Sequence, residues 1–183
     1  AGKGLIARIK GEKPGKVLAF RSDIDALPIQ EETGLPYASK NPGVMHACGH
    51  DCHMAILLAF GLVLAKHPEL VEGTVVLIFQ PTEENDPGGA KPMIATGLLD
   101  DVDAYYGYHV APELKTGEIG VNNGPVMASP TAFHIKVNGK SGHGAKPQDT
   151  VDPVVIACQL VLAFQTIVSR NVHPCDKAVI SCC

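Results

Sequence analysis

One stretch decides the fold of this chain: Met45-His46-Ala47-Cys48-Gly49-His50-Asp51-Cys52-His53, which holds two cysteines, three histidines and an aspartate. An apolar run, residues 54–60, follows at once. We interpret the two together as a loop that delivers ligand-type side chains and then turns into a buried helix. An isolated Cys-x-His motif is more often structural than metal-binding, so this interpretation depends on the rest of the chain.

The helix expected after this loop has Asp51 near its start, and aspartate caps helices by accepting hydrogen bonds from the first free N–H groups. The positive end of the helix dipole would then lie beside Cys48, and we expect it to make this thiol ionise more easily. A thiolate and an imidazole on a tight, glycine-containing loop suit a borderline transition metal. The loop therefore indicates a metal site if further ligands lie nearby.

The composition is that of a globular protein, with 183 residues of which 45% are hydrophobic and 19% charged. This length predicts one or two small domains with a proper core. The net charge of -4 gives no reason to expect nucleic acid or an anionic membrane surface as a partner. No apolar run approaches the roughly 20 residues that span a bilayer, and no signal peptide is recognisable.

The six cysteines lack the spacing of a disulfide scaffold, and most lie in apolar runs. This usage is typical of reduced thiols, so we expect a cytoplasmic protein. Cys182 and Cys183 end the chain inside an unfinished strand pattern, and Leu5 enters a strand with no preamble. We therefore expect the chain to be a piece of a longer protein.

Strand-like and helix-like patterns alternate along the first part of the chain. Residues 5–9 and 17–20 flank a Pro-Gly turn, which predicts a hairpin. A helix is predicted from the cysteine–histidine loop to about Lys66, because a proline soon follows. The continuous apolar run 74–79 predicts a strand that is buried on both faces of a sheet. A short helix over 88–99 and a strand over 104–110 complete an α/β alternation.

Acidic and histidine side chains stand where these predicted strands end. Right-handed crossovers bring successive strand ends to one rim of a sheet, where open α/β folds gather their chemistry. The loop that opens the long helix reaches the same rim. We therefore expect one site there, built with Asp23, Asp25, Glu83, Glu84 and His109.

The pattern changes near Asn123, where we place a boundary between domains 1–123 and 124–183. The second domain is predicted to be a β-α-β unit, too small to bury its sheet alone and therefore incomplete. Its predicted parts are a half-exposed strand over 132–137, a Gly-rich turn that holds His143, a helix over 151–169 and a strand from Ala178.

The chemistry that we expect follows from the residue types. One thiolate, two imidazoles and a carboxylate suit Zn²⁺, Co²⁺, Ni²⁺ or Mn²⁺ better than Ca²⁺ or Mg²⁺. Because thiolates and carboxylates can contact more than one cation, a two-metal site is consistent with the same set. The candidate ligands are Cys48, His50, Glu84 and His109.

Two further residues have candidate catalytic roles. Beside the ligand Glu84, a free Glu83 carboxylate can take a proton from water and pass it to the leaving amine; the alternative is a solvated Glu-Glu turn. His143 lies on a flexible, Gly-flanked turn. It is either an exposed turn histidine or a lid residue that donates to a developing oxyanion.

Five motifs that occur in order along nearly the whole chain resemble the M20 metallopeptidase family, and specifically its amidohydrolase branch. That branch contains hippurate hydrolases, N-acyl-amino-acid amidohydrolases and plant auxin-conjugate hydrolases. The motifs are Arg21-x-Asp23-x-Asp25-Ala-Leu-Pro28, Met45-His-Ala-Cys48-Gly-His50-Asp51-x-His53, Phe79-Gln-Pro-x-Glu83-Glu84, Tyr108-His109-Val and Ser141-Gly-His143-Gly-Ala-x-Pro147.

The resemblance implies an α/β fold with a di-metal aminopeptidase-like catalytic domain and an inserted α+β lid that forms a homodimer, both incomplete here. It implies two divalent transition-metal ions per complete subunit, with manganese or zinc expected first and nickel or cobalt as alternatives. Cys48 would be the bridging thiolate, and Glu83 the general base. His143 would help to hold the oxyanion across the dimer, and Asp23 or Asp25 would orient ligands. The other ligands would be His50, Glu84 and His109.

The chain departs from the family pattern in three respects. It lacks the histidine ligand of the C-terminal part of the catalytic domain, as well as the N-terminal segment and the second half of the lid. Arg21 stands where much of the wider superfamily has a metal-binding histidine, which is consistent with the thiolate branch. We therefore expect weak metal binding and little activity from these 183 residues alone.

The function that we predict is hydrolysis of the amide bond of N-acyl amino acids or related conjugates by a metal-activated water, as a carboxypeptidase-like amidohydrolase. The alternative is a catalytically silent or truncated relative that acts as an interaction or oligomerisation module. A third interpretation makes Cys48 a nucleophile with His50 or His46 as its base. The sequence specifies neither the acyl group nor the amino acid nor the metal.

Overall fold

The computed structural model describes residues 3–183, which form two compact units divided between Gly120 and Val121. The sequence analysis placed the domain boundary after Asn123. Each unit is described by itself below.

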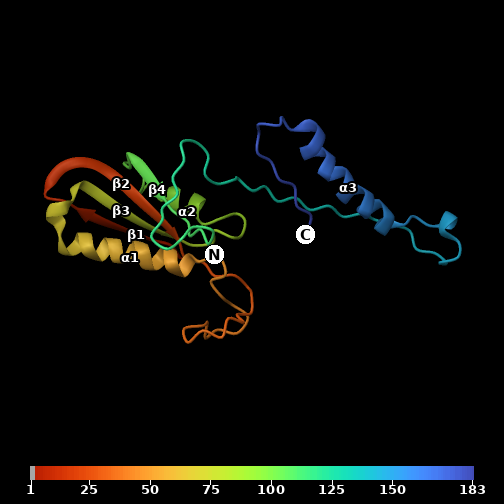
Figure 1. Cartoon of the computed structure of the whole chain (residues 1–183), viewed down its shortest axis with the longest axis horizontal. Helices are drawn as coiled ribbons and strands as arrows, with labels where there is room; N and C mark the ends of the chain where they lie inside the picture. The colour runs from red at the N-terminus through yellow and green to blue at the C-terminus, as the bar shows by residue number, and fades with distance from the viewer. Residues whose placement is uncertain (1–2) are drawn as a thin grey trace. The chain divides into compact units, whose positions relative to one another are not determined.

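The first unit is built on a four-stranded sheet (Figure 1). Its strands are β1 (Leu5–Lys10), β2 (Lys13–Asp23), β3 (Glu72–Gln80) and β4 (Ala104–Gly107), in the spatial order β1-β3-β2-β4. β1 is antiparallel to β3, whereas β2 runs parallel to both β3 and β4. Three of the four strands therefore end at the same rim of the sheet.

The hairpin predicted from residues 5–9 and 17–20 is wrong. β1 pairs with β3, with Leu5 opposite Phe79, and β3 lies between β1 and β2. The Pro-Gly turn signal is local, but an apolar strand that is buried on both faces is stabilised by pairing on both sides.

The core lies on both faces of β3, because its side chains alternate between the two faces. Val75 and Leu77 pack with the apolar side of α1 (His50–Lys66), while Val76 and Ile78 join a second cluster that includes Met93 of α2 (Ala90–Ile94). The prediction that this run is a strand buried on both faces is confirmed. The first unit is thus an α/β layer structure with α1 along one face of the sheet (Figure 1).

Helix α1 has the length predicted for it, but its cap differs from the prediction. It ends at Lys66, and a short 3-10 helix, Pro68–Leu70, follows. Gly49 is the N-cap residue, in a left-handed conformation with φ 79°, and no side chain caps the helix. Asp51 was predicted to be the N-cap and instead lies in the first turn, where its charge still suits the helix dipole.

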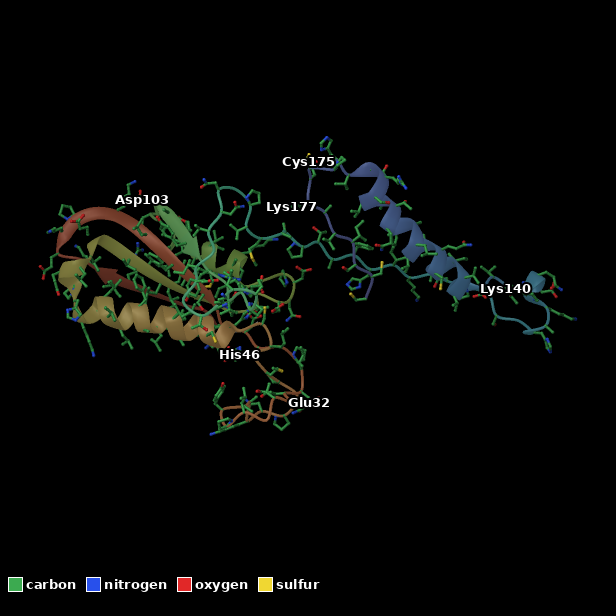
Figure 2. The ribbon with its side chains drawn as sticks, in the orientation of Figure 1. Glu32, His46, Asp103, Lys140, Cys175 and Lys177 are labelled. Atoms are coloured by element: carbon green, nitrogen blue, oxygen red, sulfur yellow. The ribbon has the colours of Figure 1, made fainter. Side chains whose placement is uncertain are left out.

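The segment between β2 and α1 leaves the sheet and returns to it. A bridge between Leu27 and Met45 closes it into a loop. Glu32 lies out on this loop, whereas His46 lies at its return, beside the start of α1 (Figure 2). The loop therefore brings the chain back to the rim where β2 and β3 end.

The second unit contains one long helix, α3 (Pro153–Asn171), and a 3-10 turn, Pro147–Asp149. Asp152 caps α3 by accepting from the N–H groups of Val154 and Val155. Within the described residues of this unit the strands predicted over 132–137 and from Ala178 do not form. The reason is that a strand needs neighbouring backbone to satisfy its polar groups.

Helix α3 also differs from the expectation that no segment is long and apolar enough to cross a membrane. The helix has 19 residues, and an 18-residue window within it has a mean hydropathy of 1.5, which meets that criterion by length and composition alone. The apolar run of α3 is interrupted by residues such as Gln159 and Gln165, and therefore no uninterrupted apolar run of this length occurs in it. A core helix of a soluble protein meets the same criterion, so α3 by itself assigns no membrane role.

Candidate metal centre

The rim of the sheet in the first unit collects side chains from four segments. Asp23 ends β2, and Cys48 and His50 stand at the start of α1. The Glu83-Glu84 pair follows β3, and His109 follows β4. The predicted convergence of strand ends is confirmed, because β2, β3 and β4 are parallel and end at one edge.

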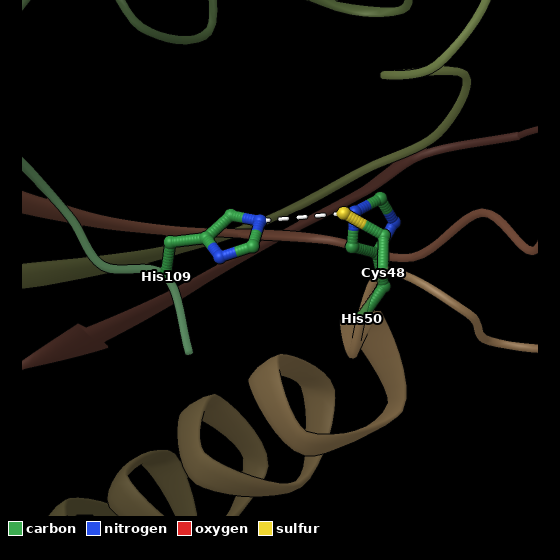
Figure 3. A group of neighbouring side chains, drawn as sticks. All are labelled: Cys48, His50 and His109. Atoms are coloured by element: carbon green, nitrogen blue, oxygen red, sulfur yellow. Dashed lines mark hydrogen bonds between the residues drawn. The ribbon is translucent and has the colours of Figure 1, made fainter. Parts of the chain in front are cut away.

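Two groups of possible ligands meet at this rim and share His50. In the first, the donor atoms of Cys48, His50 and His109 all lie within 4.8 Å of one another, and in the second the same holds for His50, Glu83 and Glu84. Figure 3 shows the sulfur of Cys48 directed at the ring of His109, with 3.4 Å between Sγ and Nε2. His50 Nε2 is 3.7 Å from Glu84 Oε1. The structure thus brings together the four ligands predicted from the sequence.

The ring of His50 is fixed in an orientation that suits a metal ligand. Its Nδ1 donates to the backbone carbonyl of Asp25 at 2.9 Å, which leaves Nε2 as the atom with a free lone pair. The side chain is 1% exposed, and no group in the described part of the chain hydrogen-bonds to Nε2. A buried nitrogen without a partner, facing a thiol and a carboxylate, fits a bound cation.

The pKa of the Cys48 thiol is raised, whereas the helix dipole was predicted to lower it. Burial, followed by the hydrogen bond and the charge of Glu84, raises the pKa of the Cys48 thiol to about 11. Glu83 and Asp23 add further negative charge. The expectation of an easily ionised thiol is therefore wrong for the metal-free chain, because burial and then the nearby carboxylates raise the pKa of Cys48 more than the helix dipole lowers it. A divalent cation would reverse this balance, since a coordinating thiol loses its proton.

Asp25 holds the backbone on which the two glutamates stand. Its Oδ2 accepts from the N–H of Glu83 at 2.8 Å and from the N–H of Glu84 at 3.0 Å. Its backbone carbonyl accepts from His50. Thr82, with φ 54°, turns the chain just before the pair. Asp25 therefore contacts three of the predicted site residues. The sequence left open whether Asp23 or Asp25 orients the ligands.

Asp23 serves a different part of the rim. It is buried, and Arg21 Nη1 donates to its Oδ2 at 2.8 Å while His53 Nδ1 donates to its Oδ1 at 2.6 Å. Burial alone would raise the pKa of Asp23, but the hydrogen bond from His53 and the charge of Arg21 outweigh it, so this pKa lies below its usual value. Asp23 is thus held as a carboxylate.

Comparison with known proteins agrees with this arrangement. The sequence profile of peptidase family M20/M25/M40 matches residues 19–178. The chain belongs to this family, in its amidohydrolase branch. The YxeP protein of Bacillus subtilis, whose crystal structure is described as that of a dinuclear metal binding peptidase from the M20 family, is 42% identical with a TM-score of 0.69, over 89% of this chain and 43% of that one.

Two relatives illustrate the extent of the match. The N-acyl-L-amino acid amidohydrolase of Geobacillus stearothermophilus is 47% identical over 177 residues, which are 97% of this chain and 48% of that protein. YhaA of Bacillus subtilis is 52% identical over 180 residues, which are 98% of this chain and 46% of that protein. The M20 chain thus spans about half the length of the curated relatives that it matches, and its α/β unit is part of an M20 catalytic domain.

One buried residue in the first turn of α1 belongs to the motif identified in the sequence, but no role was predicted for it. His53 lies near Asp23 and His50, and these three could hold an ion by proximity alone. Both ring nitrogens of His53 are already hydrogen-bonded, however, to Asp23 and to the N–H of Val110. His53 therefore has no free ring nitrogen, whereas His50 keeps its Nε2 free among the side chains that the structure describes. The signal that could have found it is its position three residues after His50, on the same face of the helix.

His143, the predicted lid residue, belongs to the second unit and is described there alone. It is exposed, and its Nδ1 accepts from the N–H of Ala145 at 3.1 Å. The predicted roles of His143 and Glu83 remain predictions, as do the ligand assignments.

Proposed function

We propose that the protein containing this chain is a metal-dependent amidohydrolase that cleaves the amide bond of N-acyl amino acids or related conjugates. The observation that carries the proposal is the buried, unpartnered Nε2 of His50 among the described side chains, placed where two groups of donor atoms meet. One group contains Cys48 and His109, and the other Glu83 and Glu84. Two donor groups that share one residue suit a pair of ions.

The donor set favours a transition metal. The residues that would hold the ions are Cys48, His50, Glu84 and His109, with Cys48 as the thiolate that would be shared between them, and manganese or zinc are expected ahead of nickel or cobalt. Thiolate and imidazole ligands disfavour calcium and magnesium. When bound, such ions supply a water acidic enough to attack at neutral pH and polarise the amide carbonyl.

Glu83 is proposed as the general base. Its carboxylate is exposed at the rim, while its own N–H is anchored to Asp25 at 2.8 Å. A carboxylate on a fixed backbone can accept a proton from the attacking water and pass it to the nitrogen of the leaving amine. The amide then yields a carboxylic acid and a free amino acid, with atoms and charge in balance.

The second unit is proposed as the first part of a lid and dimerisation domain, over residues 124–183. From such a lid His143 would donate a hydrogen bond to the developing oxyanion, reaching the site of the partner subunit. The exposed Gly-flanked turn that holds His143 is consistent with this role. The cytoplasmic location, predicted from the cysteine usage, also stays a proposal.

Hydrolysis of N-acetyl and N-benzoyl amino acids with added Mn²⁺ or Zn²⁺ tests the proposal, measured on the longest natural polypeptide that contains this chain. We expect Glu83→Gln to lower kcat by about 10²–10⁴-fold, as expected for removal of a general base. Metal content should stay unchanged. Glu32→Gln, on the loop away from the rim (Figure 2), is the matched control and should keep its rate.

An unchanged rate in Glu83→Gln would remove Glu83 from its proposed role. Chelation separates the metal mechanism from the interpretation of Cys48 as a nucleophile. A chelator should abolish hydrolysis in the first case and leave it intact in the second. If metal binds but no acyl amino acid is hydrolysed, the silent interaction module becomes the better description.

A further inference from the structure

The peptide unit next to His109 is held from two sides. The N–H of Val110 donates to Nε2 of His53 at 2.9 Å, and the carbonyl of Val110 accepts from Nδ1 of His109 at 2.7 Å. Val110 also packs closely against the loop that carries Cys48, since a Cβ on Gly49 would lie 2.5 Å from Val110 Cγ2. The segment after β4 is therefore fixed at the rim by this residue's backbone.

His53 can make these contacts in one protonation state only. It is 0% exposed, and its Nδ1 lies 2.6 Å from the Asp23 carboxylate, which can only accept. Its Nε2 faces an N–H group and must therefore be the unprotonated acceptor. His53 is thus a neutral imidazole with its proton on Nδ1, and Arg21 holds the other oxygen of Asp23.

The same reasoning fixes the ring of His109. Because its Nδ1 donates to the Val110 carbonyl, its Nε2 carries the free lone pair. This atom is the one that faces the Cys48 sulfur at 3.4 Å. The rings of His53 and His109 meet edge to face, with centroids 4.6 Å apart. A continuous chain of contacts therefore runs from Asp23 through His53 and Val110 to the predicted ligand.

We propose that His53 is a positioning residue for this site. By accepting the N–H of Val110, it sets the peptide whose carbonyl holds His109 with Nε2 directed at Cys48. The proposal rests on the proposed function in that His109 is taken as a metal ligand. It adds a residue that binds no metal itself and acts on ligand geometry across 57 positions of sequence.

A second hydrogen bond between the same two segments provides a control. The hydroxyl of Tyr108 donates to the backbone carbonyl of His53 at 2.6 Å. Tyr108→Phe removes this tie but leaves the ring of His53 and its contact with Val110 intact. If the two segments only needed to be tethered, Tyr108→Phe and a change at His53 would have the same effect at His109.

Two replacements of His53 separate its two hydrogen bonds. A glutamine can place an acceptor near the position of Nε2, so His53→Gln should keep the Val110 contact. An asparagine can place a donor near Nδ1, so His53→Asn should keep the Asp23 contact and lose the one to Val110. The control for the histidine-to-asparagine change itself is His67→Asn, just after the end of α1, where the ring is exposed and its Nδ1 lies 3.0 Å from Glu69 Oε1.

The first readout is metal-free. Nitrogen chemical shifts of the His109 ring and the exchange rate of the Val110 amide are measured on the whole chain. We expect His53→Asn to speed Val110 exchange by at least about tenfold and to mix the tautomers of His109, as follows from loss of its fixing hydrogen bond. His53→Gln and Tyr108→Phe should leave the His109 tautomer unchanged. An unchanged tautomer and amide in His53→Asn would overturn the proposal.

The second readout is cobalt titration, followed by the thiolate-to-cobalt charge-transfer absorption. We expect His53→Asn to weaken Co²⁺ binding by about 10–100-fold, the usual cost of losing a residue that orients a ligand, with rescue in His53→Gln. Equal weakening in both His53 variants and in Tyr108→Phe would reduce His53 to a packing role. The titration uses the longest natural polypeptide that contains this chain. If that unaltered protein binds no cobalt, the proposed function fails, whereas the metal-free readout still decides the role of His53.

Discussion

Helices α1 and α3 are similar in length and composition but differ in what they contact. Five of the 17 residues of α1 are buried, among them His50, His53 and Leu57, because a four-stranded sheet lies against this helix. None of the 19 residues that the structure describes in α3 is buried, and Leu162 is 70% exposed. An apolar helical pattern thus predicts a helix, whereas burial depends on a partner surface that the pattern does not contain.

The two units also differ in how firmly they hold polar side chains in place. At the start of α1 the packed sheet keeps polar side chains in single orientations, with Asp23 and His53 both almost fully buried. Around the exposed His143 of the second unit, hydrogen bonds are local, such as that from the Ala145 N–H. Precise ligand geometry is therefore expected in the first unit, and adaptable contacts in the second.

The largest expected contrast between the two helices is in amide hydrogen exchange. Amides of the buried turns of α1 open only in near-global unfolding, whereas a lone helix of the length of α3 is marginally stable in water. We expect α1 to exchange more slowly than α3 by a factor on the order of 10³ or more. Mass spectrometry of peptides from each helix, at two protein concentrations, measures the contrast. Slow exchange in α3 that is lost on dilution would show that a second copy covers this helix.

A pair of leucine substitutions sharpens the comparison. Leu57, 1% exposed, packs in the cluster between α1 and the sheet, so Leu57→Ala should cost about 2–5 kcal/mol of unfolding free energy. Leu162→Ala in α3 should change it by no more than about 0.5 kcal/mol, since an exposed side chain leaves no cavity. Urea unfolding followed by circular dichroism measures both. Equal costs would show that Leu162 is packed in solution, contrary to its exposure in the structure.

The successes and failures of the sequence analysis follow the same division between local and distant causes. The end of α1 before Pro68 and the doubly buried run of β3 were predictable, since each depends on neighbouring residues. The predicted hairpin failed because β1 pairs with β3, across about seventy positions of chain in the antiparallel ladder. The strands predicted in the second unit failed because a strand is stable only beside another strand.

In the candidate site, too, some features were predictable from the sequence and others were not. The convergence of Glu84, His109 and Cys48 was predictable because parallel strands end at one rim. The hydrogen bond from the N–H of Val110 to His53 was not predictable, because the two residues lie 57 positions apart in the chain. The pKa of Cys48 was also predicted in the wrong direction, since it is set by burial and by the charge of Glu84.

The reactivity of Cys48 tests the electrostatics of the packed rim. Alkylation requires the thiolate, so a thiol of pKa about 11, against an ordinary 9.0, should react about 100-fold more slowly at pH 7 in the metal-free chain. Because the pKa is raised, the rate should climb about tenfold per pH unit and level off only near pH 11. Iodoacetamide labelling with peptide mapping measures it against a free cysteine peptide.

A matched variant tests the cause of this slow reaction. After burial, the hydrogen bond and then the charge of Glu84 contribute most to the raised pKa of Cys48, and Glu84→Gln removes the charge. Its labelling at pH 7 should therefore be faster than that of the unaltered chain, while Glu118→Gln, far from the thiol in sequence and exposed, should have no effect. Labelling of Cys48 at the rate of the free peptide would show that the carboxylates do not control this thiol.

The smallest expected effect concerns how the two helices begin. Asp152 Oδ1 accepts from the N–H of Val154 at 2.8 Å, so Asp152→Ala should destabilise the first turn of α3 by about 1 kcal/mol. Asp51 in α1 makes no capping hydrogen bond, because Gly49 occupies the N-cap position of that helix, and Asp51→Ala should cost less. Exchange of the first-turn amides in each variant measures both. A larger loss at Asp51 would mean that α1, despite its packing, depends on a side-chain cap as α3 does.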